Sequence, residues 1–268
     1  MTAAFVQAAI AGLLLSPAGL WAAPGVCGPH VAAVYAYARF YYEDPQLGPS
    51  GIDKDMFDEL ARRSGCELRL VVESRVRIWD QMRRGSIQLT LSALPTPERR
   101  EIAELVPYAQ ARYHVLMPRA LAARVPSIAA FEADPSLRLL SVRGYAHGPV
   151  IDAWVQRMRA QGRMVEASEF TGAVRMLRAG RADALLALPG SWHGVMSAFE
   201  DPEGLVPLDV VPTERNPVAL AMAQAMPEPD RQRLRRALQA MLADGSVHEI
   251  LRRHLGDKGA KAAVYTGD

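Results

Sequence analysis

Residues 53–94 read DKDMFDELARRSGCELRLVVESRVRIWDQMRRGSIQLTLSAL, and the order of elements in this stretch decides the fold class. In residues 53–65 the apolar side chains recur at the spacing of one helix face, and the segment ends at a glycine. Residues 77–85 show the same pattern over a shorter length and also end at a glycine. Residues 67–74 and 87–94 are apolar runs with the length of buried strands. This alternation predicts a parallel sheet covered by helices.

The alternation continues on both sides of this stretch. Residues 30–38 form a strand-like run before it, and Pro97 opens an expected helix over residues 97–105 after it. A strand should follow at 112–119, and a second set of elements begins at residue 137. The second set has expected strands at 137–144, 163–169, 182–189, 205–211 and 217–224, helices at 149–162, 171–181 and 191–199, and a long helical stretch at 229–255.

The two sets predict an α/β chain divided into two lobes, each with a mainly parallel sheet flanked by helices. The first set lacks its closing elements, which the stretch after Asn216 can supply. The chain should therefore cross between the lobes twice, near Pro118 and near Pro212. The expected bounds are 24–117 and 214–257 for the first lobe, 118–213 for the second, and 258–268 for a polar tail.

Composition excludes several classes of protein. The chain has 268 residues, 50% hydrophobic and 22% charged, with a mean hydropathy of −0.02, which is typical of a soluble globular protein. Its 31 basic and 29 acidic residues are nearly balanced, so we expect no nucleic-acid partner.

The N-terminus has the layout of a secretory signal peptide. No charged residue precedes Arg39, and residues 1–23 combine an apolar region, a helix-breaking Pro17 and a small-residue exit at Ala22 and Ala23. A membrane anchor or a buried helix would be the alternative reading. We expect cleavage of residues 1–23 and a free protein in the periplasm.

The two cysteines fit an oxidising compartment. Cys27 lies just before the first strand run and Cys66 just before the second. If those strands are parallel neighbours, their starts lie side by side, within reach of a disulfide. The alternative is a pair of unpaired buried thiols. Two cysteines cannot supply a zinc site, and we expect neither a metal nor a cofactor.

The chain resembles a known family of receptors. The residues that carry the resemblance are GIDKDMFDELARRSGCELRLV at 51–71, RIWDQMRRGSIQL at 77–89, TPERREIAELVPYAQARYHVL at 96–116, LRAGRADALLALP at 177–189 and LQAMLADGSVHEILRRHLG at 238–256. These segments look like the bacterial extracellular solute-binding proteins of family 3, the amino-acid type of periplasmic binding protein. The resemblance implies two lobes, a two-strand hinge and a ligand that is trapped when the lobes close.

Four residues of the first lobe are candidates for binding an anion. Thr96 precedes a helix start whose free amides favour negative charge, and Arg99 can grip a carboxylate with two hydrogen bonds, as the matching arginine commonly does in the family. Ser92 and Ala93, at the end of a strand, can offer a hydroxyl and backbone groups. The plainer alternative is that Thr96 only caps the helix and Arg99 pairs with surface acids.

Aromatic residues follow the first strand. Phe40, Tyr41 and Tyr42 resemble the place where family members put an aromatic wall over the ligand, and Phe40 aligns best by its spacing to Gly51. Ordinary packing between the strand end and a loop is the alternative.

In the second lobe, Tyr145 and His147 lie in a glycine-flanked turn before a helix, and Leu188 and Trp192 follow a strand end. Leu188 departs from the family. Members that bind amino acids carry an acid about five positions after the aspartate of the GRAD motif, here Asp183, and that acid neutralises the ligand's amino group. The architecture therefore carries over more safely than the amino-acid ligand.

No motif of an enzyme active site occurs, whether a nucleophile elbow, a phosphate-binding loop or a zinc-protease helix. We expect a monomeric receptor that captures a small anionic solute for an ABC permease or a periplasmic sensor. The alternatives are a receptor-derived protein that binds or assists another periplasmic protein, and a dehydratase-like enzyme on the same scaffold.

Overall fold

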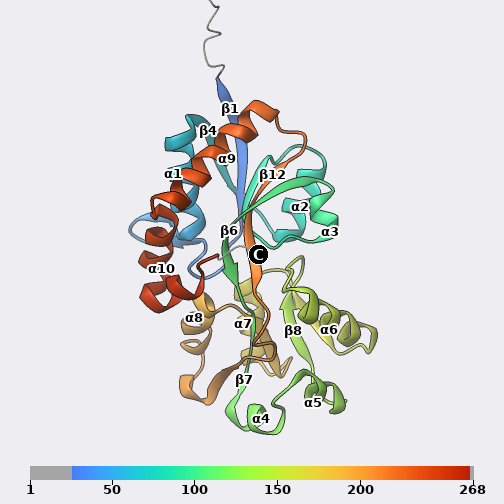
Figure 1. Cartoon of the computed structure of the whole chain (residues 1–268). Coiled ribbons are helices and arrows are strands. Elements are labelled where there is room, and N and C mark those ends of the chain that lie inside the picture. Colours follow the sequence, from blue (N-terminus) through green and yellow to red (C-terminus); the bar gives the residue numbers. More distant parts are fainter. Residues whose placement is uncertain (1–25, 266–268) are drawn as a thin grey trace, which may run out of the picture.

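The computed structural model describes residues 26–265, which form two α/β lobes, one above the other in Figure 1. The leader expected at residues 1–23 lies outside the described residues. The first lobe is built on a sheet with the strand order β4-β1-β5-β12-β6. These strands span Cys66–Val72 (β4), Cys27–Val34 (β1), Leu89–Ala93 (β5), Asn216–Ala223 (β12) and Ala103–Ala111 (β6).

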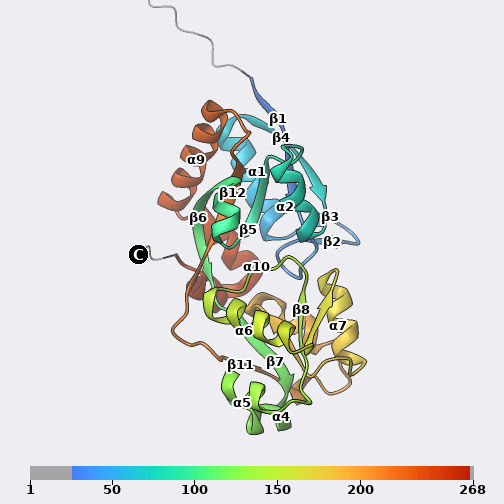
Figure 2. The ribbon, with the colours of Figure 1, turned by 90° about the vertical axis from the view of Figure 1, so that its right-hand side faces the viewer.

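Helices cover both faces of this sheet (Figure 2). They are α1 (Ile52–Ser64), α2 (Arg75–Arg83), α3 (Pro97–Arg100), α9 (Glu228–Ala243) and α10 (Ser246–Ala262), and a small hairpin of β2 (Tyr42–Asp44) and β3 (Gly48–Ser50) precedes α1. α1 buries Met56, Phe57 and Leu60 and ends at Gly65, whose φ of 68° is the left-handed conformation that glycine adopts without strain.

The second lobe has a sheet with the order β11-β7-β10-β8-β9. Its strands are β11 (Leu205–Leu208), β7 (His114–Pro118), β10 (Ala184–Ala187), β8 (Leu139–Val142) and β9 (Met164–Ala167). Its helices are α4 (Arg119–Arg124), α5 (Ile128–Ala133), α6 (Pro149–Ala160), α7 (Phe170–Arg178) and α8 (Trp192–Met196), with single turns η1 (Pro189–Ser191) and η2 (Pro202–Gly204). Most strands of both sheets run parallel, as predicted for this fold class.

Two stretches of chain connect the lobes and form the hinge. β6 leads into β7 through Arg112 and Tyr113, and β11 returns to β12 through residues 209–215. The connections lie side by side, because Asn216 pairs with Ala111 at the end of β6. None of the described helices is long and apolar enough to span a membrane.

The first crossing comes earlier than the boundary expected after residue 117. β7 pairs antiparallel with β10 and β11 and therefore belongs to the second sheet. Residues 103–118 contain no glycine that would mark the change of sheet. The sequence expectation consequently placed most of β7 in the wrong lobe.

Two other expectations are corrected by long-range contacts. The helix expected at 97–105 ends at Arg100, because residues 103–111 pair along their whole length with β12. The polar tail expected from residue 258 is helical to Ala262, after a bend at Gly256. This last turn is held in place because the Gln110 N–H donates to the carbonyl of Ala263 at 3.0 Å.

Cys27 and Cys66 form a disulfide, as predicted, with their Cα atoms 4.5 Å apart. The two residues are directly paired at the start of β1 and β4. The bond thus joins a central strand to the edge strand beside it.

We predict that Cys27→Ser/Cys66→Ser will lower the free energy of unfolding by about 4 kcal/mol, because the 39-residue separation closes a long loop in the unfolded chain. Urea denaturation of the oxidised protein and the double variant measures the difference. Protein recovered from the periplasm should show no alkylatable thiol. Two freely alkylated cysteines in that material would contradict the prediction.

Candidate functional site

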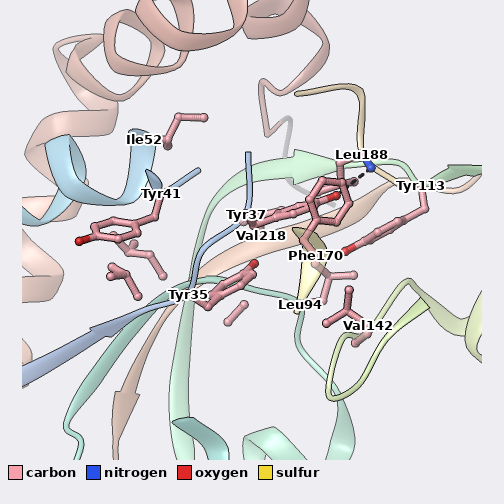
Figure 3. Packing of buried hydrophobic residues seen from close by; sticks show 14 of the residues in the cluster. Tyr35, Tyr37, Tyr41, Ile52, Leu94, Tyr113, Val142, Phe170, Leu188 and Val218 are labelled. Atoms are coloured by element: carbon pink, nitrogen blue, oxygen red, sulfur yellow. Dashed lines mark hydrogen bonds between the residues drawn. The ribbon is translucent and has the colours of Figure 1, made fainter. Parts of the chain in front are cut away.

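Aromatic rings fill the centre of the interface between the lobes. Tyr35 and Tyr37 follow β1 and are buried. Tyr145, from the second lobe, meets both rings edge-on at centroid distances of 5.3 and 5.5 Å, and Phe170 meets Tyr37 at 4.5 Å. Figure 3 shows the rings of Tyr35, Tyr37 and Phe170 gathered between strands of both lobes. These contacts hold the lobes closed over an apolar centre.

A hydrogen bond crosses the interface beside these rings. The Leu188 N–H donates to the Tyr37 hydroxyl at 3.0 Å, and that hydroxyl lies 3.5 Å from the Ser191 Oγ to which it donates. Ser191 in turn donates to the Leu188 carbonyl at 2.8 Å. Burial raises the pKa of Tyr37 well above its ordinary value, so this hydroxyl stays protonated.

Arg99 makes a second polar contact between the lobes. Its guanidinium donates to the Leu94 carbonyl at 2.7 Å and to the Gly144 carbonyl of the second lobe at 3.0 Å. The group lies 4.4 Å from the ring centre of Trp79. Burial, and then the charge of Arg75, lower the pKa of Arg99 to about 9. Two of its five N–H donors are used by these carbonyls, which leaves donors for a ligand.

Arg75, at the start of α2, is the second buried arginine of the site. It donates to the carbonyls of Leu91 and Ser92 at 3.2 and 2.8 Å and lies 4.4 Å from the Tyr35 ring centre. Arg75 and Arg99 therefore bring two guanidinium groups to one side of the interface.

Asp53 is a buried carboxyl group whose charge interacts with that of Arg75. It is fully buried and accepts a hydrogen bond from Ser92 Oγ at 2.7 Å, while its Oδ2 has no hydrogen-bond partner. Burial raises the pKa of Asp53 to about 7, although Ser92 and Arg75 act in the opposite direction. Near neutral pH this carboxyl is only partly ionised, so it only partly offsets the charge of Arg75, whereas the acidic charge that acts on Arg99 is that of Asp152.

A small cavity opens at the edge of the interface. Its volume is about 190 Å³, and it is lined by Tyr35, Arg75, Val142, Tyr145, Ser168 and Glu169, among others. We call it the mouth cavity. Its volume is below the ~300–1,000 Å³ of typical small-molecule sites, so the closed form accommodates a small solute at most.

Several predicted site residues do meet at the interface: Arg99, Tyr145 and Leu188 make the contacts between the lobes described above. Ser92 lies just behind them and supports Asp53. Its φ of 53° is in the left-handed region, which costs a serine on the order of 1 kcal/mol or more, and its bonds to Asp53 and Arg75 hold it there.

Other predicted site residues lie elsewhere. Ala93 is buried where β5 pairs with β12, and Thr96 caps α3 by accepting a hydrogen bond from the Arg99 N–H at 3.4 Å. Tyr41 is buried apart from the interface rings, as Figure 3 shows, and its hydroxyl donates to Glu43 at 2.7 Å. Tyr42 belongs to the β2–β3 hairpin.

Three more predicted residues lie next to the hinge. Phe40 stacks on the Tyr37 ring at 5.2 Å, and Trp192 meets His114 edge-on at 4.7 Å. His147 is buried, with its Nδ1 2.9 Å from Asp152. Its ring packs on the hinge residue Tyr113, so it faces the hinge rather than the mouth cavity.

Sequence reasoning missed Tyr35, Tyr37, Arg75, Asp53 and Phe170. A signal existed for the two tyrosines, because residues two apart in an extended chain face the same side, and VYAYA at 34–38 places both on one side. Burial of Arg75 and Asp53 depends on distant parts of the chain and has no local signal.

One group of potential metal ligands occurs among residues 26–265, namely Cys27, His30 and Asp230. The sulfur of Cys27 is bound in the disulfide, so only His30 and Asp230 remain, and they pair with each other at 2.8 Å. This arrangement does not fit a resident metal ion.

Comparison with known families agrees with this two-lobed geometry. Residues 30–257 match the family described as bacterial extracellular solute-binding proteins, family 3. The chain belongs to this family. The match includes both lobes, both hinge connections and α9.

Solved structures share the fold of this family 3 protein. A solute receptor for L-cysteine from Neisseria gonorrhoeae has 18% identity and a TM-score of 0.73, covering 88% of this chain and 95% of its own. The P235GK mutant of ArgBP from T. maritima has 18% identity and a TM-score of 0.69, with coverages of 85% and 95%. A putative L-cystine ABC transporter protein from Listeria monocytogenes has 14% identity and a TM-score of 0.72, with coverages of 87% and 98%. No curated protein is significantly similar in sequence.

We predict that Asp53→Asn will remove a pH dependence of stability. Because burial raises the pKa of Asp53 to about 7, the folded protein keeps a proton that the unfolded chain releases near pH 4. This stabilisation is complete below about pH 4 and is lost as the pH rises through about 7. From pH 5 to pH 8 the free energy of unfolding should fall by about 2–3 kcal/mol more in the wild type than in Asp53→Asn.

Denaturant unfolding at the two pH values measures this difference. Asp58→Asn is the matched control, because Asp58 is an exposed carboxylate on the same helix. It should keep the pH dependence of the wild type. Equal pH dependence in Asp53→Asn and the wild type would show that folded Asp53 does not titrate between pH 5 and pH 8, and would contradict the prediction.

Proposed function

We propose that this family 3 protein is a periplasmic receptor that closes its two lobes over a small carboxylate with an apolar or aromatic body. The observation that carries the proposal is the pair of buried guanidinium groups, Arg75 and Arg99, which donate to backbone carbonyls and form no ion pair among the described residues. A buried surplus of positive charge is costly, and a ligand carboxylate would offset it.

Opening of the lobes would release the groups needed for binding. The bonds from Arg99 to Gly144 and from Leu188 to Tyr37 both cross the interface, so they must break when the lobes separate. The freed Arg99 could then bind the carboxylate with two hydrogen bonds. The rings of Tyr35 and Tyr145 would pack on the ligand body as the lobes close again.

Leu188 argues against an amino acid as the preferred ligand. Its position is buried and carries no charge, so an ammonium group placed there would be unpaired. Asp209 cannot compensate, because it pairs with the hinge residue Arg112 at 3.1 Å. We therefore propose an anionic solute in preference to a zwitterion.

One observation favours a zwitterionic amino acid as the second candidate. Glu169 lines the mouth cavity, and its only described ion-pair partner is Arg175, at 3.4 Å and largely exposed. An ammonium group at the mouth could pair with Glu169 while the carboxylate binds an arginine. The same experiment separates the two candidates.

The simplest partner for such a receptor is an ABC permease, to which it would deliver its solute. A periplasmic sensor protein is the alternative partner.

We propose that the protein is a monomer and that it is exported with cleavage of a signal peptide near residue 23. We propose no catalysis, because Asp53, whose carboxyl has the raised pKa, does not line the mouth cavity. Turnover of a bound solute would instead favour a dehydratase-like enzyme.

We predict that Arg99→Ala will weaken binding of a carboxylate solute roughly 10- to 150-fold, which corresponds to about 1.5–3 kcal/mol for hydrogen bonds to a charged group. Titration calorimetry should use matched pairs of amino acids and their des-amino acids. In each pair of which at least one member binds, the des-amino acid should bind more tightly than the amino acid. Arg100→Ala is the control, since Arg100 is exposed on the same short helix and should bind as the wild type does.

Tighter binding of the amino acid would favour the second candidate and the role of Glu169. Equal binding by Arg99→Ala and the wild type would remove Arg99 from the site. If no small solute binds and one periplasmic protein co-purifies instead, the accessory role replaces the receptor role.

A further inference from the structure

A second and larger cavity, which we call the hinge groove, lies against the hinge and the last helix. Its volume is about 610 Å³, within the ~300–1,000 Å³ of small-molecule sites. Its lining comes from the end of β6, both hinge connections, β12, the turn after β10 and α10. The residues are 108–111, Arg112, Arg215, Val218, 188–190, Leu251, His254, Leu255, Gly259 and Ala262, among others.

The hinge groove is separate from the mouth cavity. Tyr37 lines neither of them. One set of its neighbours, Tyr35 and Tyr145, lines the mouth cavity, and the other set, Phe40 and Leu188, lines the hinge groove. The ring of Tyr37 therefore forms a wall between the two spaces, and a ligand in one does not occupy the other.

The lining of the hinge groove includes a broad apolar surface. Phe40, Leu188, Val218, Leu251 and Leu255 all contribute to it. Leu188 comes from the second lobe, whereas Phe40, Val218 of β12 and the two α10 leucines come from the first lobe. A ligand with a hydrocarbon body could bury apolar area against all of these parts at once.

The charged part of the lining is basic, and none of the aspartates and glutamates that the structure describes lines the hinge groove. Among residues 26–265, Arg39, His193 and Arg215 line it, are exposed and have no acidic ion-pair partner. The three further basic residues of the lining, Arg112, His114 and His254, pair with aspartates that lie outside it. The unpaired positive charge complements an anionic head group.

We propose that the hinge groove is a second binding site, which takes a carboxylate with a medium-length hydrocarbon chain. The chain packs on Phe40, Leu251 and Leu255, and the carboxylate lies near Arg39 and Arg215. Because Phe40 and Leu188 belong to different lobes, the groove has this shape only when the lobes are closed. Its ligand therefore favours the closed arrangement and is coupled to solute binding between the lobes.

Titration calorimetry with decanoate, below its micelle concentration, tests the proposal on the purified full-length mature protein. One decanoate should bind per chain, and the uncharged decanol should bind at least tenfold more weakly. Arg39→Gln/Arg215→Gln should weaken decanoate binding about tenfold. The control is Arg83→Gln/Arg236→Gln, which makes the same charge change at two exposed arginines outside the lining and should bind decanoate as the wild type does.

A variant of the apolar lining gives an independent readout. Leu255→Asp should abolish decanoate binding, whereas Leu242→Asp, an exposed leucine of α9, should not. The absence of saturable decanoate binding would overturn the proposal, as would equal losses in the groove variant and its control. Binding that Arg99→Ala abolishes and Arg39→Gln/Arg215→Gln leaves unchanged would place decanoate between the lobes and also overturn it.

Discussion

The hydrogen bond from the Leu188 N–H to the Tyr37 hydroxyl is the contact on which the closed arrangement depends. It joins the first lobe to the second at a fully buried point, where an unpaired N–H would cost about 1–3 kcal/mol. The rings of Tyr145 and Phe170 pack around the same tyrosine. Tyr37 therefore makes several of the contacts that close the lobes, beside the hydrogen bond from Arg99 to the Gly144 carbonyl. A solute that displaces some of these contacts has to supply comparable ones.

Much of the fold could be predicted from local patterns. Apolar spacing and glycine stops located α1 and α2, and the short apolar runs located β4 and β5, because these elements bury one face or one run of consecutive residues. The pattern failed at residues 101–105, where local helix preference gave way to nine residues of pairing with a strand more than a hundred positions away. It also failed at the first crossing, because β6 was not recognised as a strand and the strand expected at 112–119 was assigned to the first lobe.

The site could be predicted only where a residue follows the end of a strand. Tyr145 and Leu188 lie in turns after β8 and β10, Arg99 lies on the short helix α3 after β5, and the structure brings all three to the facing surfaces of the lobes. The structure places Tyr41 and Phe40 outside the mouth cavity, because counting along the chain does not tell which side of a turn a ring takes. The burial of Arg75 and Asp53 arises from packing between elements, and the charge of the site depends on both.

The placement of the second lobe within the first has a consequence for how the chain acquires its structure as it emerges N-terminus first. β1, β4 and β5 are complete by residue 93, but their sheet lacks β12 until residue 223 has appeared. The strands of the second lobe, between residues 114 and 208, are all available before then, so that lobe can finish first. During this interval an early crosslink between Cys27 and Cys66 would keep two waiting strands in register, which gives the disulfide a part in assembly as well as in the finished protein.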